Sequence, residues 1–458
     1  MSMTPLLTAL LALAPLGQDI EPFEFDARAA EHLLSRAGFG ATTDEVEAAV
    51  EAGLDATVER LLEGGDRVRD PFWAERLSPK NMSRDERLSE ARERRGAGMN
   101  LRGMDEEQRR EMLRDYVTDQ RRDDERQLRS YTDWWIDSML EGEDPLRDRM
   151  ALFWHGYFTS SQTDVRDSYE LILQAEHLRE HALGSFRELL WGVAKSPAML
   201  EYLDNDDNQA GEPNENFARE LLEMFTLGEG HYTEADVLEA ARAFTGWTDR
   251  RGEFRFRRSR HDSSEKTILG QTGRHDGADV LDILLAHQRT PVHVAERLLT
   301  YLEGRDPSPE RAERYGRILR TNDMVLAPML EALFKDPAFY REAIVGQRIA
   351  SPIDLLVGLA RRLRVDPPPL LVSRGADLLG EKLFYPPNVS GWDGEEAWIT
   401  TAMFMRRGNL AGVLLGEVSL AELISPDAPL PGFEPEMDDD GPRIDRNLRD
   451  LSRIQRLG

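Results

Sequence analysis

The sequence predicts a mainly helical protein, a single large domain of many helices with one small β-hairpin at about residues 252–270. Apolar side chains recur every three or four positions along most of the 458-residue chain, which is the spacing of a buried helix face. Only residues 253–257 alternate apolar and charged side chains, and we expect residues 266–270 to pair with them. Prolines and glycines separate the helical segments.

Composition and charge exclude several classes of function. The formal net charge of −27 disfavours binding to nucleic acid or to an anionic membrane surface, because both are polyanions. The chain has no cysteine, which excludes disulfides, thiolate catalysis and cysteine-ligated zinc or iron–sulfur sites. Hydrophobic residues make up 40% of the chain, so a large core is possible, and the acidic balance is compatible with cation binding.

The first 25 residues are set apart as a signal or apolar N-terminal segment. Residues 5–16 form an apolar run that is too short to span a bilayer but has the length of a signal-peptide core. No Lys or Arg precedes this run, so an apolar strap is the alternative. We expect an extracytoplasmic location, periplasmic or secreted. No other stretch is apolar enough for a membrane span.

The helical domain is expected to extend from residue 26 to residue 424. Residues 64–129 are dense in Arg, Asp and Glu and predict a charged helical insertion held by opposite-charge pairs. Residues 425–458 form an acidic, Pro-rich tail that we expect to be disordered. The other helices are expected at residues 26–36, 44–52, 55–63, 130–141, 145–158, 167–181, 184–195, 234–245, 277–287, 291–303, 308–321, 324–334, 337–343, 351–364, 374–381, 399–416 and 419–424.

Residues 213–228 contain the most informative helix. Asn214 follows a proline and is a candidate N-cap, and the helix should end at Gly228 or Gly230. Its polar residues lie at offsets of 0, 3, 4 and 7, which places them in one stripe roughly 100° wide: Asn216, Arg219, Glu220 and Glu223. This stripe could bind a metal, a sugar or another polar ligand. The alternative is an exposed face held by pairs such as Arg219–Glu223.

Other candidate residues lie far from this helix in the sequence. His155 lies among aromatic residues, and is either a proton carrier or ligand, or a core histidine. Residues 260–266 contain His261, Asp262 and Lys266, which could perform acid–base chemistry or belong to an ordinary exposed loop. Trp247 and Trp392 each follow a glycine, and are either ligand platforms or plugs that seal a loop to the core.

Several stretches together resemble a bacterial family, domain of unknown function 1800. They are residues 32–42, 145–158, 213–228, 244–247 and 383–392, with His261, Asp262 and Lys266. The resemblance covers roughly residues 28–420 and implies one mostly helical, often exported domain. It also implies a gene neighbour of the family numbered 1501, which resembles sulfatases and alkaline phosphatases. No established reaction comes with it.

One position departs from the family pattern. The family usually shows Trp-His-Asn-His-Phe where this chain has Trp154-His155-Gly156-Tyr157-Phe158. A metal site that needs both imidazoles would therefore lack one ligand here, although a deprotonated phenol can ligate a metal. The remaining signature positions match: His155, Asn214, Asn216, Arg219, Glu220, Glu223, His261, Asp262 and Lys266.

These observations favour two functional hypotheses. The first is a hydrolase-like enzyme that acts on a glycan or similar polar polymer, in which the candidate residues meet in one hollow. Glu220 or Glu223 would be general acid or base, His155 and His261 proton carriers, Arg219 an anion clamp, Asn214, Asn216, Asp262 and Lys266 binding groups, and Trp247 and Trp392 platforms. A divalent metal on Glu220, Glu223 and His155 is a variant. The second is a non-catalytic scaffold that binds a sulfatase-like partner at the cell envelope.

Overall fold

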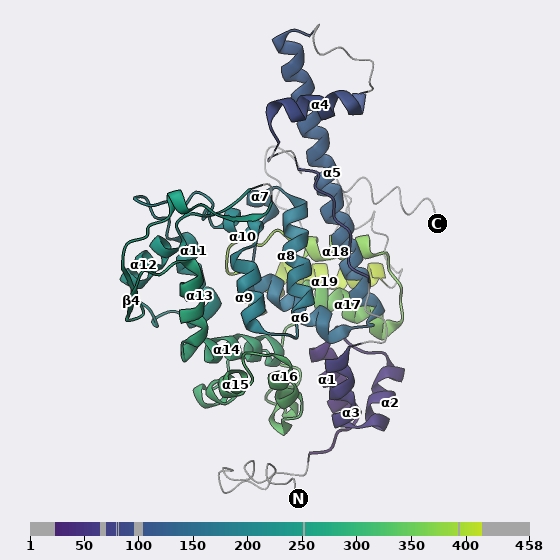
Figure 1. Cartoon of the computed structure of the whole chain (residues 1–458). Helices are drawn as coiled ribbons and strands as arrows, with labels where there is room; N and C mark the ends of the chain where they lie inside the picture. The colour runs from purple at the N-terminus through teal and green to yellow at the C-terminus, as the bar shows by residue number, and fades with distance from the viewer. Residues whose placement is uncertain are drawn as a thin grey trace, which may run out of the picture.

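The computed structural model describes residues 23–64, 70–78, 80, 82–95, 104–250, 252–392 and 394–414. This part of the chain is mainly helical, with nineteen α-helices and two small antiparallel sheets, which confirms the predicted fold class (Figure 1). The predicted acidic tail and the helix expected at residues 419–424 lie outside the described residues, as does nearly all of the predicted N-terminal segment.

The first three helices form a small group at the base of the molecule. They are α1 (Ala27–Ala37), α2 (Thr43–Ala52) and α3 (Leu54–Glu63). Thr42 caps α2: its hydroxyl accepts a hydrogen bond from the Glu45 N–H, and the Glu45 carboxylate accepts one from the Thr42 N–H.

A helical arm projects from the body (Figure 1). It consists of α4 (Arg84–Arg95) and the first half of α5 (Glu106–Glu141), which share a small apolar cluster of their own built on Ala91, Met112 and Tyr116. The second half of α5 enters the body and packs on α8, α17 and α18. The expected boundary at residue 129 therefore falls inside one continuous helix, because no proline or glycine interrupts residues 106–141.

The body is built around α6 (Pro145–Tyr157), whose residues are buried on nearly every side. The helices that follow are α7 (Gln162–Val165), α8 (Ser168–Glu180), α9 (Phe186–Ala194), α10 (Pro197–Tyr202), α11 (Asn216–Leu222), α12 (Glu234–Phe244), α13 (Gly277–Ala286), α14 (Arg289–Glu303), α15 (Pro309–Thr321) and α16 (Ala327–Phe334). A π-helix, η3 (Glu223–Leu227), continues α11 and ends at Gly228, where the sequence predicts the stop.

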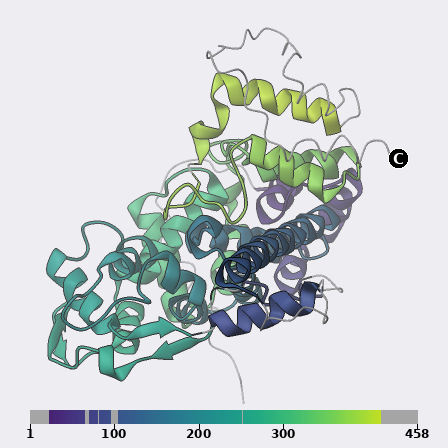
Figure 2. The ribbon, with the colours of Figure 1, turned by 90° about the horizontal axis from the view of Figure 1, so that it is seen from above.

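The C-terminal helices stack on the base of α5. Helices α17 (Pro352–Leu363) and α18 (Pro369–Leu378) pack on α5, and α19 (Thr401–Leu414) lies beyond them (Figure 2). The short 3₁₀ helix η6 (Glu395–Ile399) precedes α19. One continuous hydrophobic cluster extends from Leu33 to Leu414 and joins all of these layers.

The β structure differs from the expected single hairpin. Strand β1 (Trp247–Asp249) pairs with β2 (Phe254–Phe256), and β3 (Lys266–Ile268) pairs with β4 (Gln271–Gly273). The predicted pairing of residues 253–257 with 266–270 is therefore wrong. Each strand instead finds its nearest neighbour in sequence, and Leu269 and Gly270, both at positive φ, form the two-residue turn between β3 and β4.

Candidate functional site

The loop of residues 384–392 lies on the C-terminal end of α6. The Thr159 hydroxyl, just after α6, donates a hydrogen bond of 2.7 Å to the Val389 carbonyl. Gly391 has φ +85°, and a Cβ at this position would lie 2.7 Å from the Gly156 carbonyl oxygen. The loop can therefore approach α6 this closely only because residue 391 is a glycine.

A cavity of about 440 Å³ lies beside this loop, and we call it the Trp392 cavity. Its aromatic lining comes from α6, α14, the loop and η6: Phe153, Tyr157, Tyr301, Trp392 and Trp398. Its polar lining is Arg297, Thr300, Arg348, Ser351, Glu381 and Ser390. Of the predicted site residues, all of which the structure describes, Trp392 alone lines this cavity. An aromatic cavity with a few polar groups is the usual form of a small-ligand site.

Glu381 is the carboxyl group of this lining. Its side chain is 6% exposed and accepts a hydrogen bond of 2.8 Å from the Ile353 N–H at the start of α17. Burial raises the pKa of Glu381 to about 7, and the nearby Asp354 carboxylate adds to the rise, although hydrogen bonds and Arg348 oppose it. A carboxyl group that titrates near neutral pH can both donate and accept a proton.

The walls around Glu381 are held by buried arginines. Arg149 of α6 pairs with Asp354 of α17 and also donates to the Tyr301 hydroxyl at 3.1 Å. Arg348 pairs with the other oxygen of Asp354, and its guanidinium lies 4.7 Å from the Tyr301 ring centroid. The two guanidinium groups hold the pKa of Asp354 down to about 2 despite its burial.

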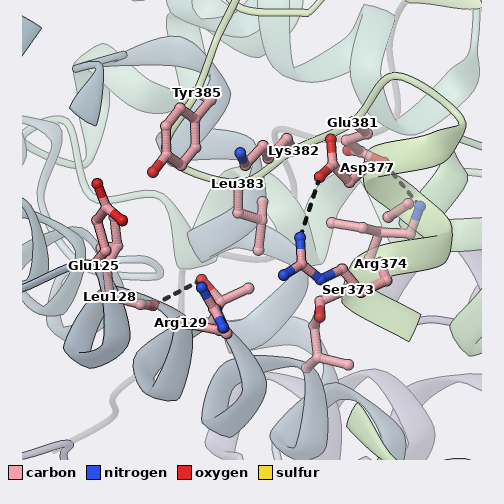
Figure 3. A pocket seen from close by; sticks show the side chains of 14 residues that line it. Glu125, Leu128, Arg129, Ser373, Arg374, Asp377, Glu381, Lys382, Leu383 and Tyr385 are labelled. Atoms are coloured by element: carbon pink, nitrogen blue, oxygen red, sulfur yellow. Dashed lines mark hydrogen bonds and ion pairs between the residues drawn. The ribbon is translucent and has the colours of Figure 1, made fainter. Parts of the chain in front are cut away.

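A second cavity, of about 250 Å³, lies between α5 and α18 (Figure 3). Glu381 lines this cavity too, so it belongs to the wall between the two hollows. Charges of both signs surround the second cavity, including an Arg374–Asp377 pair at 3.8 Å and Lys382, whose Nζ lies 3.8 Å from the Tyr385 ring centroid. This mixture of charges favours no single class of ligand.

The polar stripe of the α11 helix forms local contacts. The N-cap of α11 is Glu215 and not the predicted Asn214. The Asn214 side chain, one residue earlier, accepts a hydrogen bond of 3.0 Å from the Asn216 N–H, and the Asn216 amide donates to Asp204 at 3.3 Å. Arg219 binds Glu234 through two hydrogen bonds, of 2.9 and 2.7 Å, and Glu215 at 3.0 Å.

The expected Arg219–Glu223 pair does not form. Glu223 instead accepts a hydrogen bond from the Tyr232 hydroxyl. The helix widens into the π-helix at Glu223, and Glu234 offers both of its oxygens to Arg219. Glu220 is half-buried with no hydrogen bond or ion pair to a described residue, and burial, followed by the charge of Glu223, raises its pKa.

His155 holds the 384–392 loop against α6. Its Nε2 accepts a hydrogen bond of 3.2 Å from the Phe384 N–H, and its ring lies 5.6 Å from the ring of Trp392. Burial lowers the pKa of His155 to about 4, so the imidazole is neutral at neutral pH. No hydrogen bond or ion pair joins His155 to Glu220, Glu223 or His261 in the part of the chain that the structure describes. Its role as proton carrier stays a prediction.

His261, Asp262 and Lys266 belong to a compact knot of hydrogen bonds after α12. The His261 ring nitrogen Nδ1 lies 3.0 Å from the Thr245 carbonyl, and Lys266 donates to the carbonyls of Asp262 and Ser264. Burial opposes ionisation of Asp262, but hydrogen bonds from Ser264 and Arg242 hold its pKa well below its usual range. Burial lowers the pKa of Lys266. The contacts of His261 and Lys266 with these carbonyls hold the backbone of the loop, whereas Asp262 pairs with the Arg242 side chain at 2.8 Å.

Trp247 is packed inside the protein. Its side chain is 3% exposed, and its ring lies 5.2 Å from Phe244 and 4.9 Å from Phe254. This burial favours a role for Trp247 in sealing its loop to the core over a role as a ligand platform. Trp392 differs, because it is half-buried and faces a cavity.

Sequence reasoning missed Glu381, Arg297 and Arg348. The one available signal is that Glu381 lies two residues before the aromatic 383–392 stretch. Within the described residues, no group of three His, Cys, Asp or Glu side chains is arranged to hold a metal ion. The metal variant built on Glu220, Glu223 and His155 therefore has no support. No helix in the same part of the chain is long and apolar enough to cross a membrane.

Comparison with known proteins gives one finding. A family model described as "Protein of unknown function (DUF1800)" matches residues 32–453. No curated protein and no solved structure matches the chain.

Proposed function

We propose a function from the premise that this chain belongs to the DUF1800 family, a family of unknown function. We infer that it is an extracytoplasmic, hydrolase-like enzyme that acts on a glycan or similar polar polymer, and that the Trp392 cavity holds the sugar unit at which the reaction occurs. The general acid would be Glu381 rather than Glu220 or Glu223.

The observation that carries the proposal is the pairing of aromatic rings with one titratable carboxyl group. Trp392, Trp398 and Tyr301 contribute aromatic rings to the lining, and Ser351 and Ser390 lie in the same lining as Glu381. Sugars have apolar ring faces and polar edges, so they suit a lining of this kind. Arg149 and Arg348 lie over the ring of Tyr301 and hold it in place, which keeps this wall of the cavity rigid before a ligand binds.

Glu381 would act as general acid. Its proton would pass to the leaving oxygen as that bond to carbon breaks, and water would supply the new oxygen. Glu381 is the only carboxyl group among the described lining residues. The proposed reaction therefore uses one carboxyl group, whereas most glycosidases use two. Glu381 would then take the proton of the attacking water, which restores its acid form.

A glycan panel tests this proposal. We expect the wild-type protein to release reducing ends from at least one glycan, and Glu381→Gln to lose about 10²-fold or more of that rate. Glutamine keeps an oxygen that can accept from the Ile353 N–H, so the fold should survive. Exposed Glu396→Gln is the matched control. Equal rates for Glu381→Gln and wild type would reject the assignment.

One observation favours the second function, a scaffold for a sulfatase-like partner. Trp73 lies at the base of the helical arm and is 87% exposed, although its neighbour Phe72 packs on Tyr131 at 5.5 Å. Tryptophan is the residue type most enriched at the centres of protein interfaces. If the scaffold function holds, Trp73→Ser abolishes co-purification of the partner from the native host while Glu381→Gln does not.

A further inference from the structure

We propose that the ligand of the Trp392 cavity is an acidic saccharide, and that Arg297 binds its anionic group. This inference rests on the proposed function, because it names the substrate class for the same cavity. The observation that carries it is a positive charge in the cavity lining, that of Arg297, which no described acidic residue neutralises.

Arg297 of α14 is the arginine of this lining without an acidic partner. It is half-buried and forms no hydrogen bond or ion pair with a described residue. Its guanidinium lies 5.7 Å from the ring centroid of Tyr157, another residue of the cavity. By contrast, Arg348 in the same lining pairs with Asp354, and Arg289 on the same helix pairs with Glu296.

The charge around the cavity opposes the charge of the whole protein. The lining holds two guanidinium groups, those of Arg297 and Arg348, and one carboxyl group, that of Glu381. Behind it, Asp354 pairs with Arg348 and with the buried Arg149. The chain as a whole carries a formal net charge of −27. A cationic cavity in such an acidic protein attracts an anionic ligand, while the remaining surface repels it. An anionic ligand would therefore bind at the cavity rather than elsewhere on the protein.

The chemistry of the guanidinium group identifies the class of ligand. Its planar fork of N–H donors matches the paired oxygens of a carboxylate or a sulfate. The aromatic faces of Trp392 and Trp398 would hold the sugar ring that carries this group. A uronic acid and a sulfated sugar share this chemistry, so both are tested.

Gly156 provides a way to close the cavity without breaking the fold. It lines the cavity, and a Cβ at this position would meet no atom within 4 Å. Gly156→Leu therefore places a side chain into open space and replaces a helical glycine by a better helix former. Loss of binding in this variant, with the melting temperature kept or raised, locates the ligand in the cavity.

The experiment measures equilibrium binding of three tetrasaccharides: a galacturonate tetramer, a sulfated galactose tetramer and a neutral galactose tetramer. The proteins are wild type, Arg297→Gln, Arg297→Lys, Gly156→Leu and the matched control Arg317→Gln, at an exposed position away from the cavity. All proteins are used as the full chain, and circular dichroism confirms their folding.

We expect wild type to bind at least one acidic tetramer about tenfold or more tighter than the neutral one. Arg297→Gln should remove this preference, Arg297→Lys should keep part of it, Arg317→Gln should keep all of it, and Gly156→Leu should abolish binding. The stronger of the two acidic probes shows whether a carboxylate or a sulfate is preferred.

Two contrary results are distinguishable. If the neutral tetramer binds as tightly as the acidic ones, or if Arg297→Gln keeps the preference, the anionic ligand is rejected; loss of that binding in Gly156→Leu would still leave the proposed saccharide site in place. If no tetramer binds wild type, or if Gly156→Leu binds normally, the inference and the proposed function both fall.

Discussion

The Glu381 carboxylate accepts a hydrogen bond of 2.8 Å from the backbone N–H of Ile353, 28 residues away in the sequence. This contact places a buried acid at the start of α17, in the wall between two cavities. Because the same carboxyl group holds a helix end and faces a hollow, its ionisation should change both the stability and the function of the protein.

The stability of the protein should depend on the ionisation of Glu381. Burial raises its pKa from 4.5 to about 7, so the folded state binds the proton more tightly than the unfolded state. This contribution is present in full below pH 4.5 and is lost as pH rises through about 7. Relative to Glu381→Gln, wild type should lose roughly 3 kcal/mol of unfolding free energy between pH 4.5 and pH 8.

Urea denaturation of both proteins across this pH range measures the difference. Asp354, Arg348, Arg407 and Ser351 face Glu381 in both proteins, so their own effects cancel to first order. A difference in free energy that stays constant from pH 4.5 to pH 8 would contradict the raised pKa.

Gly391→Ala should destabilise the protein. A Cβ there would lie 2.7 Å from the Gly156 carbonyl, and φ is +85°. The strain of a side chain at positive φ costs about 1–2 kcal/mol, before any displacement of the loop. The matched control is Gly394→Ala, where a Cβ meets nothing within 4 Å. Thermal melts should show a lower midpoint for the first variant alone; equal midpoints would mean that the loop does not lie on α6 this closely.

Gly156→Ala should stabilise the protein slightly. The new Cβ enters open space near the end of α6, and replacing a helical glycine by alanine contributes up to about 1 kcal/mol. Differential scanning calorimetry checks the direction. A fall in the melting temperature would show that the space beside Gly156 is filled.

Lys266→Met should destabilise the protein without changing the binding of a saccharide. Lys266 is 1% exposed and donates to two backbone carbonyls, those of Asp262 and Ser264. Leaving these carbonyls unpaired costs roughly 1–3 kcal/mol. Denaturation and tetrasaccharide binding are measured on the same sample. Weaker binding in a still-folded protein would return Lys266 to the site, as the sequence alone suggests.

The sequence predicts local structure well because its causes are local. The helix expected at residues 145–158 is found at Pro145–Tyr157, and the α11 segment ends at Gly228, one of the two predicted stops. The predicted pairing of residues 253–257 with residues 266–270 is wrong, because the alternation of apolar and charged side chains identifies a strand but does not identify its partner.

The site was harder to predict because it depends on distant contacts. Arg297 lies on a helix of ordinary amphipathic spacing, and only the fold brings it beside Trp392. Glu381 lies two residues before the 383–392 stretch, but its raised pKa comes from burial and from Asp354, and both depend on the fold. His155 was correctly associated with aromatic residues, and its ring does lie near that of Trp392.

A crystal structure of the protein with the tightest-binding tetrasaccharide is the most direct test of the central claim. The account predicts electron density for a sugar ring against Trp392 and Trp398, with its anionic group within hydrogen-bond distance of Arg297. Density on the Glu220 and Glu223 face of α11, with the Trp392 cavity free of sugar, would contradict it.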